Sequence, residues 1–320
     1  MLDKIVSRRT FVGISPFLAS GLYSCIKDGN SSDEAIKPLK PVFAAWGGSS
    51  TQGVANTVSY PSHLQQIFPE RKIENFGLPS QSSLQIAARQ GGVPVTLSID
   101  NDKFNGNNSI PVNSISIKLL STQAHNLPIS ITGTVKGVKC KLLRIATGAF
   151  PKQVESYSLT PLTPSEAVIP KYSFFIPDDA INNRDSLQIL WLGRNDLPDF
   201  VGVADVIENC IDYIKKPAQF LVIGILNSVF ETGNNHIYKS ILNLNSILAS
   251  KYTENYIPAT PPTNEEMNAI KYSPTNQDKI EIAANTFPAS MRISDGYHLN
   301  TIGNLIIATR VAAKIKEKGW

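Results

Sequence analysis

The chain contains few of the residues that build metal and redox sites. Three cysteines and four histidines occur among its 320 residues, and no CxxC pair or HExxH motif is present. Because structural zinc needs closely spaced thiolate and imidazole ligands, the sequence predicts neither a structural metal nor a metal cofactor. Sequence spacing leaves open whether Cys140 and Cys210 form a disulfide.

Long apolar runs and concentrated charge are also missing. No uninterrupted apolar stretch reaches the length of about 18 residues expected of a membrane-spanning helix. Lys and Arg number 30 against 26 Asp and Glu, and this small excess forms no basic stripe. Nucleic-acid binding normally requires such a stripe, so no nucleic-acid partner is predicted. Apolar residues make up 42% of the chain, which is enough for a sizeable core.

Residues 1–25 have the organisation of a signal segment. Basic residues, Arg8 and Arg9 among them, precede a short apolar run over residues 11–22. The segment Ser-Arg-Arg-Thr-Phe-Val at residues 7–12 resembles the twin-arginine export motif. An ordinary secretory signal that happens to contain two arginines is the alternative.

A candidate lipidation site follows this run. Leu22-Tyr23-Ser24-Cys25 resembles a lipobox, in which the cysteine is acylated and becomes the new N-terminus. Residues 26–40 contain Gly, Asn, Ser and several charges, a composition typical of a flexible tether. The two signals predict a bacterial envelope protein that is exported and held at a membrane by a lipid anchor. The alternative for Cys25 is a free cysteine near a peptidase site.

The rest of the chain changes its hydrophobic pattern twice. Residues 41–92 and 186–320 alternate apolar, strand-like runs with helical apolar spacing. Strands that alternate with helices predict a parallel sheet covered on both faces. Residues 93–185 instead alternate at period two and are divided by turn clusters, which predicts an inserted all-β domain.

Individual elements can be placed within this scheme. The strands expected in the α/β part cover residues 41–46, 72–76, 187–192 and 220–225. Helices are expected from about residue 63 to 67 and over residues 82–89, 201–215, 236–251 and 300–316.

A glycine-rich turn at the end of the first strand carries the first candidate catalytic residue, in the sequence Gly47-Gly48-Ser49-Ser50-Thr51-Gln52-Gly53. In an open α/β sheet, ligands bind at the carboxyl ends of strands, and glycines let a substrate approach the backbone. The segment matches neither a P-loop nor the GxSxG elbow of α/β-hydrolases. Taken alone, it is also compatible with a Ser/Gly-rich turn that caps a helix.

A second candidate segment, Asp295-Gly296-Tyr297-His298, lies at the start of the last expected helix. Its spacing can place a carboxylate against imidazole Nδ1 and leave Nε2 free as a general base. A capping aspartate with a surface histidine is the alternative. The other histidines lie on a helical pattern, in the insert and near a helix start, and we expect them to be structural or surface residues: His63, His125 and His236.

Two further segments follow predicted strands and offer hydrogen-bond donors. Gly193-Arg194-Asn195-Asp196 places a side-chain amide after the third strand of the α/β part. Asn75-Phe76-Gly77-Leu78-Pro79 places a backbone N–H of Gly77 after the second. Donors at such positions can stabilise an oxyanion, although Asn and Gly after a strand are commonly turn residues.

In their order along the chain, these four segments resemble the sequence blocks of the SGNH (GDSL-like) hydrolases, a family of serine esterases. The G-x-S-x-T-x-G register places the nucleophile at Ser49 rather than Ser50. The resemblance implies a three-layer α/β/α flavodoxin-like domain with a parallel sheet, and a catalytic triad of Ser49, Asp295 and His298. It also implies an oxyanion hole made by the N–H groups of Ser49 and Gly77 and the amide of Asn195. No metal or other cofactor is implied.

One position departs from the family pattern. The family usually has Asp before the nucleophilic serine, where this chain has Gly48. That Asp is not a triad member in the family, so the resemblance implies that the chemistry survives while the local turn geometry changes.

The expected function is hydrolysis of ester groups, of the O-acetyl kind, on envelope or capsular carbohydrate. A run like that at residues 86–92, next to the insert, is similar to one in insert-bearing esterases that act on surface glycans. Aromatic residues of the insert could stack on sugar rings or belong to its core: Tyr157, Tyr172 and Phe174. The alternatives are a lipase or thioesterase acting on acyl chains, and a non-catalytic surface-binding lipoprotein.

Overall fold

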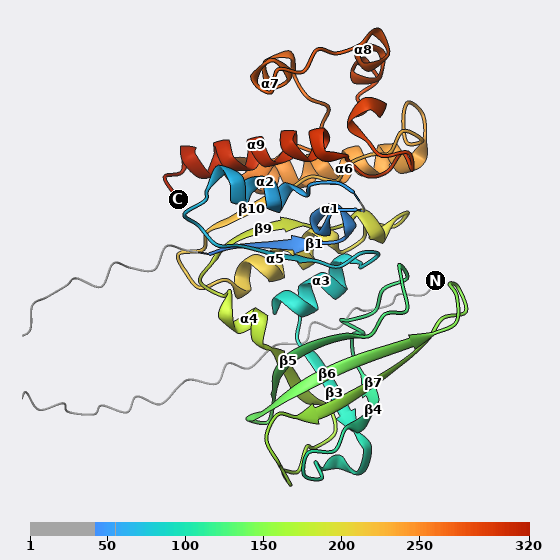
Figure 1. The fold of residues 1–320 in the computed structure, drawn as a ribbon, viewed down its shortest axis with the longest axis vertical. Coiled ribbons are helices and arrows are strands. Elements are labelled where there is room, and N and C mark those ends of the chain that lie inside the picture. The colour runs from blue at the N-terminus through green and yellow to red at the C-terminus, as the bar shows by residue number, and fades with distance from the viewer. Residues whose placement is uncertain (1–41, 55) are drawn as a thin grey trace, which may run out of the picture. The chain divides into compact units, whose positions relative to one another are not determined.

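The computed structural model describes residues 42–54 and 56–320 (Figure 1). The predicted signal segment at residues 1–25, the lipidation site Cys25 and the tether at residues 26–40 lie outside the described residues. Among the helices of the described part, none combines the length and the hydropathy needed to cross a bilayer.

The first part of the fold is a parallel sheet of five strands. Its strands are β1 (Phe43–Gly47), β2 (Ile73–Gly77), β9 (Leu187–Trp191), β10 (Phe220–Ile223) and β11 (Tyr256–Ile257). They lie in the order β11-β10-β9-β1-β2, and all neighbouring pairs are parallel. After β1 the chain first adds β2 on one side of it. The next strand of this sheet, β9, then lies on the other side of β1. Every residue of β1 and β9 is buried, as expected of a sheet covered on both faces.

Alternate side chains of β1 enter two different hydrophobic clusters, because successive residues of a strand point to opposite faces. Phe43 and Ala45 belong to the cluster on one face, and Ala44 and Trp46 to the cluster on the other. Helices cover both faces.

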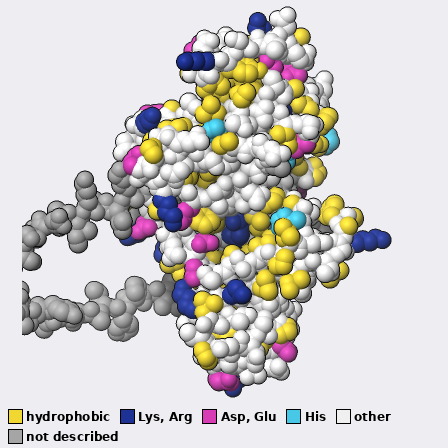
Figure 2. All heavy atoms as spheres, viewed as in Figure 1, with side chains coloured by type: hydrophobic (Ala, Val, Ile, Leu, Met, Phe, Trp, Pro, Cys, Tyr) yellow, Lys and Arg dark blue, Asp and Glu magenta, His cyan; other side chains and the backbone are white. Residues whose placement is uncertain are grey.

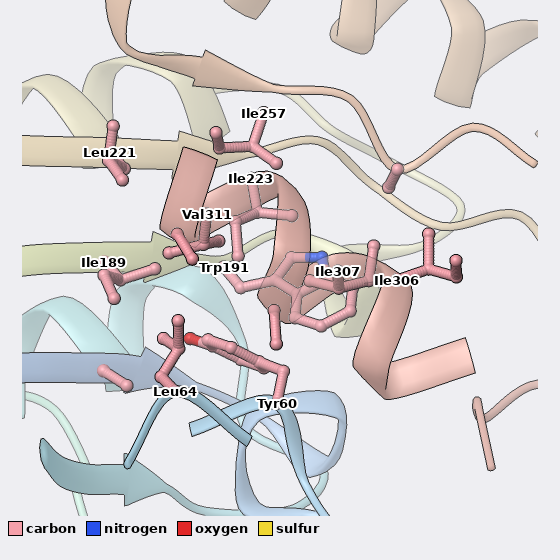
Figure 3. Packing of buried hydrophobic residues seen from close by; sticks show 14 of the residues in the cluster. Tyr60, Leu64, Ile189, Trp191, Leu221, Ile223, Ile257, Ile306, Ile307 and Val311 are labelled. Atoms are coloured by element: carbon pink, nitrogen blue, oxygen red, sulfur yellow. The ribbon is translucent and has the colours of Figure 1, made fainter. Parts of the chain in front are cut away.

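The helices of the first face are α2 (Tyr60–Ile67) and α9 (Thr301–Glu317). Figure 3 shows side chains from these helices packed against those of the sheet strands. The labelled residues from the helices are Tyr60, Leu64, Ile306, Ile307 and Val311, and those from the strands are Ile189, Trp191, Leu221, Ile223 and Ile257.

The helices of the second face are α3 (Ser83–Gln90), α5 (Val203–Tyr213) and α6 (His236–Lys251). The helices predicted from apolar spacing are all present, with ends that differ by a few residues at most. The expected parallel sheet is present as well.

The expected β-rich insert forms a closed barrel of six antiparallel strands. The strands are β3 (Val95–Ile99), β4 (Ile110–Ile115), β5 (Ile129–Val135), β6 (Val138–Thr147), β7 (Val154–Pro161) and β8 (Ser173–Pro177), in the order β3-β4-β7-β6-β5-β8. Buried and exposed side chains alternate most clearly in β6, where Cys140, Leu142 and Arg144 are buried and their neighbours are more exposed. Tyr157 is also buried in this barrel, so it belongs to the core, whereas Tyr172 and Phe174 are exposed.

Shorter elements complete the chain. They are α1 (Ser49–Gln52), α4 (Asp178–Asn182), α7 (Asn264–Ala269), α8 (Asn276–Ala283) and the 3-10 turns Asp100–Asp102, Arg194–Asp196, Thr253–Asn255 and Ala289–Met291. The sequence patterns predict none of the elements between α6 and α9.

Cys140 and Cys210 do not bond to each other. Cys140 lies in the core of the barrel, and Cys210 packs on α5 against the sheet. Each is buried and free. Burial raises the pKa of the Cys140 thiol to about 12 and raises that of Cys210 as well, which suits packing rather than reaction.

Acidic and basic side chains are interspersed on the face shown in Figure 2, where no basic stripe forms.

Candidate active site

The candidate nucleophile lies where the strand order of the sheet reverses. β1 ends at Gly47, and Ser49 begins α1 directly beyond it. Since β2 and β9 flank β1, the crevice at its carboxyl end is where an open α/β sheet binds ligands. Glycine is required at position 47, because a Cβ there would lie 2.0 Å from Thr51 Oγ1 and 2.9 Å from the Trp191 carbonyl oxygen.

The structure brings Ser49, His298 and Asp295 into one hydrogen-bonded line. Ser49 Oγ lies 2.7 Å from His298 Nε2, although 249 residues separate the two in sequence. His298 Nδ1 lies 2.5 Å from Asp295 Oδ2 on its other side. With the Nδ1 proton donated to the carboxylate, Nε2 is left to accept the proton of the Ser49 hydroxyl.

Backbone hydrogen bonds hold the carboxylate of Asp295 in place. Its Oδ1 accepts the N–H groups of Tyr297 and His298 at 2.8 and 3.0 Å. Burial opposes ionisation, but these N–H groups and the imidazole outweigh it and hold the pKa of Asp295 below its ordinary value. The group is therefore a carboxylate that orients the imidazole.

A buried guanidinium organises the loop that carries this pair. Arg292 donates to the carbonyl oxygens of Phe287 at 3.0 Å and Asn227 at 2.7 Å, and to those of Gly296 and Tyr297 at 3.4 and 3.3 Å. Burial, followed by the nearby positive charge of Arg194, lowers the pKa of Arg292 to about 10. Arg292 thus ties the triad loop to the loop that follows β10.

The side chain of Asn195 lies beside the nucleophile. Its Nδ2 donates to the Gln81 carbonyl oxygen at 2.9 Å, and it would lie 3.1 Å from a Cβ placed on Gly48. An amide nitrogen carries two hydrogens, so one remains for a ligand. Gly48, Ser49 and Asn195 are among the residues that line a small cavity of about 10 Å³.

Gly77, predicted as an oxyanion donor, has its N–H group engaged within the protein. The N–H of Gly77 donates to Asn75 Oδ1 at 2.9 Å and is therefore already satisfied. Glycine is needed here for a different reason, because a Cβ would lie 2.1 Å from the backbone nitrogen of Gln52 in α1. The residue allows α1 to pack closely on β2.

Ser80, in the same loop, is a donor that the sequence patterns do not indicate. Its φ of 58° lies in the left-handed region, which is uncommon for a residue other than glycine. Its N–H has no hydrogen-bond partner among residues 42–54 and 56–320. Only a glycine at this position would have signalled the unusual backbone.

Contacts with the barrel hold the loop that contains Ser80. Gln81 Nε2 donates to the carbonyl oxygens of Leu119 and Ser121 at 2.8 and 3.0 Å. The Thr122 hydroxyl donates to the Pro79 carbonyl at 2.7 Å. The first contact involves Gln81 itself, whose backbone carbonyl accepts from Asn195, and the second involves Pro79, two residues earlier.

Arg89 supports Gln81 from the other side. Arg89 Nε donates to Gln81 Oε1 at 2.8 Å, and Nη1 donates to the Phe76 carbonyl at 2.8 Å. Burial lowers the pKa of Arg89 to about 10. The side chain of Gln81 is itself buried, so all its polar atoms find their partners within the protein.

Asp196, next to Asn195, anchors the start of α3. Its carboxylate accepts the N–H of Ser83 at 2.8 Å and the Ser83 hydroxyl at 2.9 Å. Burial raises the pKa of Asp196, and the two hydrogen bonds oppose that shift. Asp196 therefore links the segment Gly193–Asp196 to the start of α3 by hydrogen bonds.

The remaining histidines do not join the triad. His63 is buried, and its Nε2 lies 3.1 Å from the Thr301 carbonyl oxygen, which is a structural contact. His125 lies in the barrel unit, and His236 begins α6. In the described part of the chain, no group of three His, Cys, Asp or Glu side chains is placed to hold a metal ion.

No model of a known protein family matches the sequence, and no curated protein is significantly similar to it. A functional assignment therefore depends on the residues and their geometry.

Proposed function

We propose that the protein is a serine ester hydrolase of the SGNH (GDSL-like) family. The observation that carries the proposal is the line from Ser49 Oγ through His298 to Asp295, with separations of 2.7 and 2.5 Å. Such a line makes a hydroxyl nucleophilic, because the imidazole accepts its proton and the carboxylate stabilises the imidazolium that forms.

The proposed reaction has two halves. His298 Nε2 takes the proton of Ser49 as Oγ attacks the ester carbonyl carbon, and then returns it to the leaving alcohol oxygen as the ester C–O bond breaks. Water next attacks the acyl-enzyme, giving a proton to His298 that returns to Ser49 Oγ as the acid leaves. His298 mediates every proton transfer in this scheme.

Three donors are proposed for the oxyanion: the backbone N–H groups of Ser49 and Ser80 and the side-chain amide of Asn195. Ser80 takes the place that the sequence patterns assign to Gly77, because its N–H lacks a partner within the described residues. Asn195 is supported by its position beside Gly48. Such donors stabilise the charge that develops on the carbonyl oxygen.

We further propose that residues 41–92 and 186–320 form a three-layer α/β/α flavodoxin-like domain. Numbered along the chain, the five sheet strands lie in the order 2-1-3-4-5, which is the flavodoxin-like order. The two hydrophobic clusters on opposite faces support the three layers. The barrel then represents the insert at residues 93–185.

The proposed substrate is an O-acetyl ester of envelope or capsular carbohydrate. Ser49 lines a small cavity of about 10 Å³ rather than a long apolar channel. A larger apolar groove, lined by residues such as Val93 and Phe174, contains none of the triad residues.

The proposed location is the bacterial cell envelope, with lipid attached at Cys25. The described chain enters β1 at the end of the sheet opposite Ser49. An N-terminal anchor would therefore join the domain away from the catalytic edge.

The first test compares hydrolysis of p-nitrophenyl acetate by the protein lacking residues 1–25, by Ser49→Ala and by Ser50→Ala. We expect Ser49→Ala to abolish activity, because it removes the nucleophile, and Ser50→Ala to retain it. Equal activity in the parent and in Ser49→Ala would refute the proposal. Faster hydrolysis of octanoyl than of acetyl esters would indicate a lipase or thioesterase instead.

A further inference from the structure

Two aromatic rings lie exposed at the catalytic edge. Tyr297 stands between the triad residues Asp295 and His298 in sequence, and Phe230 lies in the loop after β10. Their side chains are 43% and 63% exposed, and their ring centroids are 5.5 Å apart with planes tilted by 49°. The two rings therefore form one continuous aromatic surface.

Backbone contacts fix the two loops to each other. The N–H of Val229 donates to the Gly296 carbonyl at 3.1 Å. Gly296 has a φ of 74°, and a Cβ there would lie 2.7 Å from Val229 Cγ2. The rings are thus carried by loops that pack tightly, although the rings themselves face solvent.

An ion pair lies against the Tyr297 ring. The Arg194 guanidinium lies 5.5 Å from the centroid of the Tyr297 ring. Arg194 also binds Glu231 through two hydrogen bonds of 2.7 and 3.0 Å. Burial opposes ionisation of Glu231, but Arg194 and the N–H of Ser228 outweigh it and lower its pKa. The pair is therefore charged, and Arg194 remains in place under Tyr297.

The position of this surface relates it to the reacting atoms. Arg194 directly precedes Asn195, and both residues line the small cavity at Ser49. Tyr297 directly precedes His298, whose Nε2 contacts Ser49 Oγ. Arg194, which lines the cavity and lies 5.5 Å from the centroid of the Tyr297 ring, therefore connects the rings to the cavity at the nucleophile.

We propose that Phe230 and Tyr297 form a stacking platform for the sugar ring that carries the ester. This inference rests on the proposed esterase function and specifies its substrate. A pyranose presents an apolar C–H face that matches an aromatic face. Exposed aromatic side chains on firmly held loops are better explained by ligand binding than by folding.

The test uses the full chain and two acetyl esters that differ in the alcohol. Glucose pentaacetate has a sugar ring, whereas ethyl acetate has no ring at all. For Phe230→Ala and for Tyr297→Ala we expect kcat/KM on glucose pentaacetate to fall about 5- to 10-fold relative to that on ethyl acetate. The relative loss should appear chiefly in KM, because the rings bind the alcohol part and do not touch the reacting atoms.

Two further variants control for folding and for aromatic character. Phe230→Leu keeps an apolar side chain but lacks an aromatic face, so it should show the same relative loss as Phe230→Ala. Phe174→Ala removes a ring of similar exposure, 59%, from strand β8 of the barrel, and should leave the ratio of the two esters unchanged. Equal losses on both esters, or wild-type ratios in both platform variants, would overturn the platform.

A binding measurement on a variant that lacks the nucleophile tests the stacking platform separately from the proposed esterase activity. Titration of Ser49→Ala with glucose pentaacetate, followed by protein fluorescence, is compared with titration of the Ser49→Ala/Phe230→Ala double variant. Weaker binding by the double variant supports the platform, and equal binding contradicts it. Ester hydrolysis that survives in Ser49→Ala would instead contradict the esterase mechanism.

Discussion

At the scale of single residues, the lack of a side chain at Gly48 affects the geometry of the candidate site. A Cβ at this position would lie 3.1 Å from Asn195 Nδ2, which is tighter than an ordinary contact. The sequence pattern that this segment resembles has Asp here, and in this chain the Asn195 amide lies close to the position that its Cβ would take. We infer that Gly48 and the position of Asn195 are coupled.

This coupling predicts the effect of restoring the family residue. Gly48→Asp should displace the Asn195 amide and lower kcat by about tenfold, less than the ~10²–10³ typical of losing an oxyanion donor. Gly48→Ala, which adds only the Cβ, should have a smaller effect in the same direction. Steady-state hydrolysis of p-nitrophenyl acetate measures both, and wild-type kcat in Gly48→Asp would show that Asn195 is not constrained by this position.

At the scale of elements, the loop between β2 and α3 links the barrel to the candidate oxyanion hole. Gln81 receives the amide of Asn195 through its backbone carbonyl and binds barrel carbonyls through its side chain. The same loop contains Ser80, whose left-handed backbone depends on how its neighbours are held. The barrel therefore contributes to the geometry of the site without supplying a triad residue.

A double-mutant cycle tests whether Gln81 acts through Asn195. Asn195→Ala should lower kcat by ~10²–10³ with little change in KM, and Gln81→Ala should lower kcat by a smaller factor. If Gln81 positions the amide, Gln81→Ala should cause little further loss in the Asn195→Ala background. Fully multiplicative losses would show that Gln81 affects activity independently of Asn195.

At the scale of the whole molecule, an ion pair joins the region after β11 to the last helix. Arg310 of α9 donates to Glu266 of α7 through Nε and Nη2, at 2.6 and 2.7 Å, and also to the carbonyl oxygens of Pro258, Thr260 and Pro261. Glu266 accepts the N–H of Thr263 as well. Burial opposes ionisation of Glu266, but these partners outweigh it and lower its pKa.

The direction of this shift predicts a pH dependence of stability. The folded pKa of Glu266 lies below its ordinary value of 4.5. Its contribution to the free energy of unfolding is therefore fully present above about pH 4.5 and is lost as the pH falls through the folded pKa. Glu266→Gln should be less stable than the wild type at pH 7, and this difference should shrink at pH 3.5.

Urea unfolding at the two pH values measures the difference. Glu317→Gln, which alters an exposed ion pair with Lys314, is the matched control and should change stability much less. A Glu266→Gln difference that is equal at pH 7 and pH 3.5 would contradict the prediction.

The sequence by itself was sufficient for the features that local patterns record. Period-two and helical spacing predicted the β-rich insert, four sheet strands and the helices that cover the sheet. Polar residues after strands indicated Ser49 and Asn195, and the three-residue spacing before the last helix indicated Asp295 and His298. The structure brings Ser49, His298 and Asp295 into contact and places Ser49 and Asn195 at one small cavity. The carboxyl ends of parallel strands share one edge of a sheet, so strand ends make the grouping of Ser49 and Asn195 predictable.

Only the tertiary structure decided which donors remain available and how the parts connect. Gly77 was a reasonable donor from its place after a strand, but the folded chain brings Asn75 Oδ1 to its N–H. Ser80 acquires its left-handed backbone in a loop bound by the barrel, and no local pattern records contacts between residues some 40 positions apart. Hydrogen-bond partners and close approaches such as these depend on distant neighbours, whereas periodicity depends on adjacent ones.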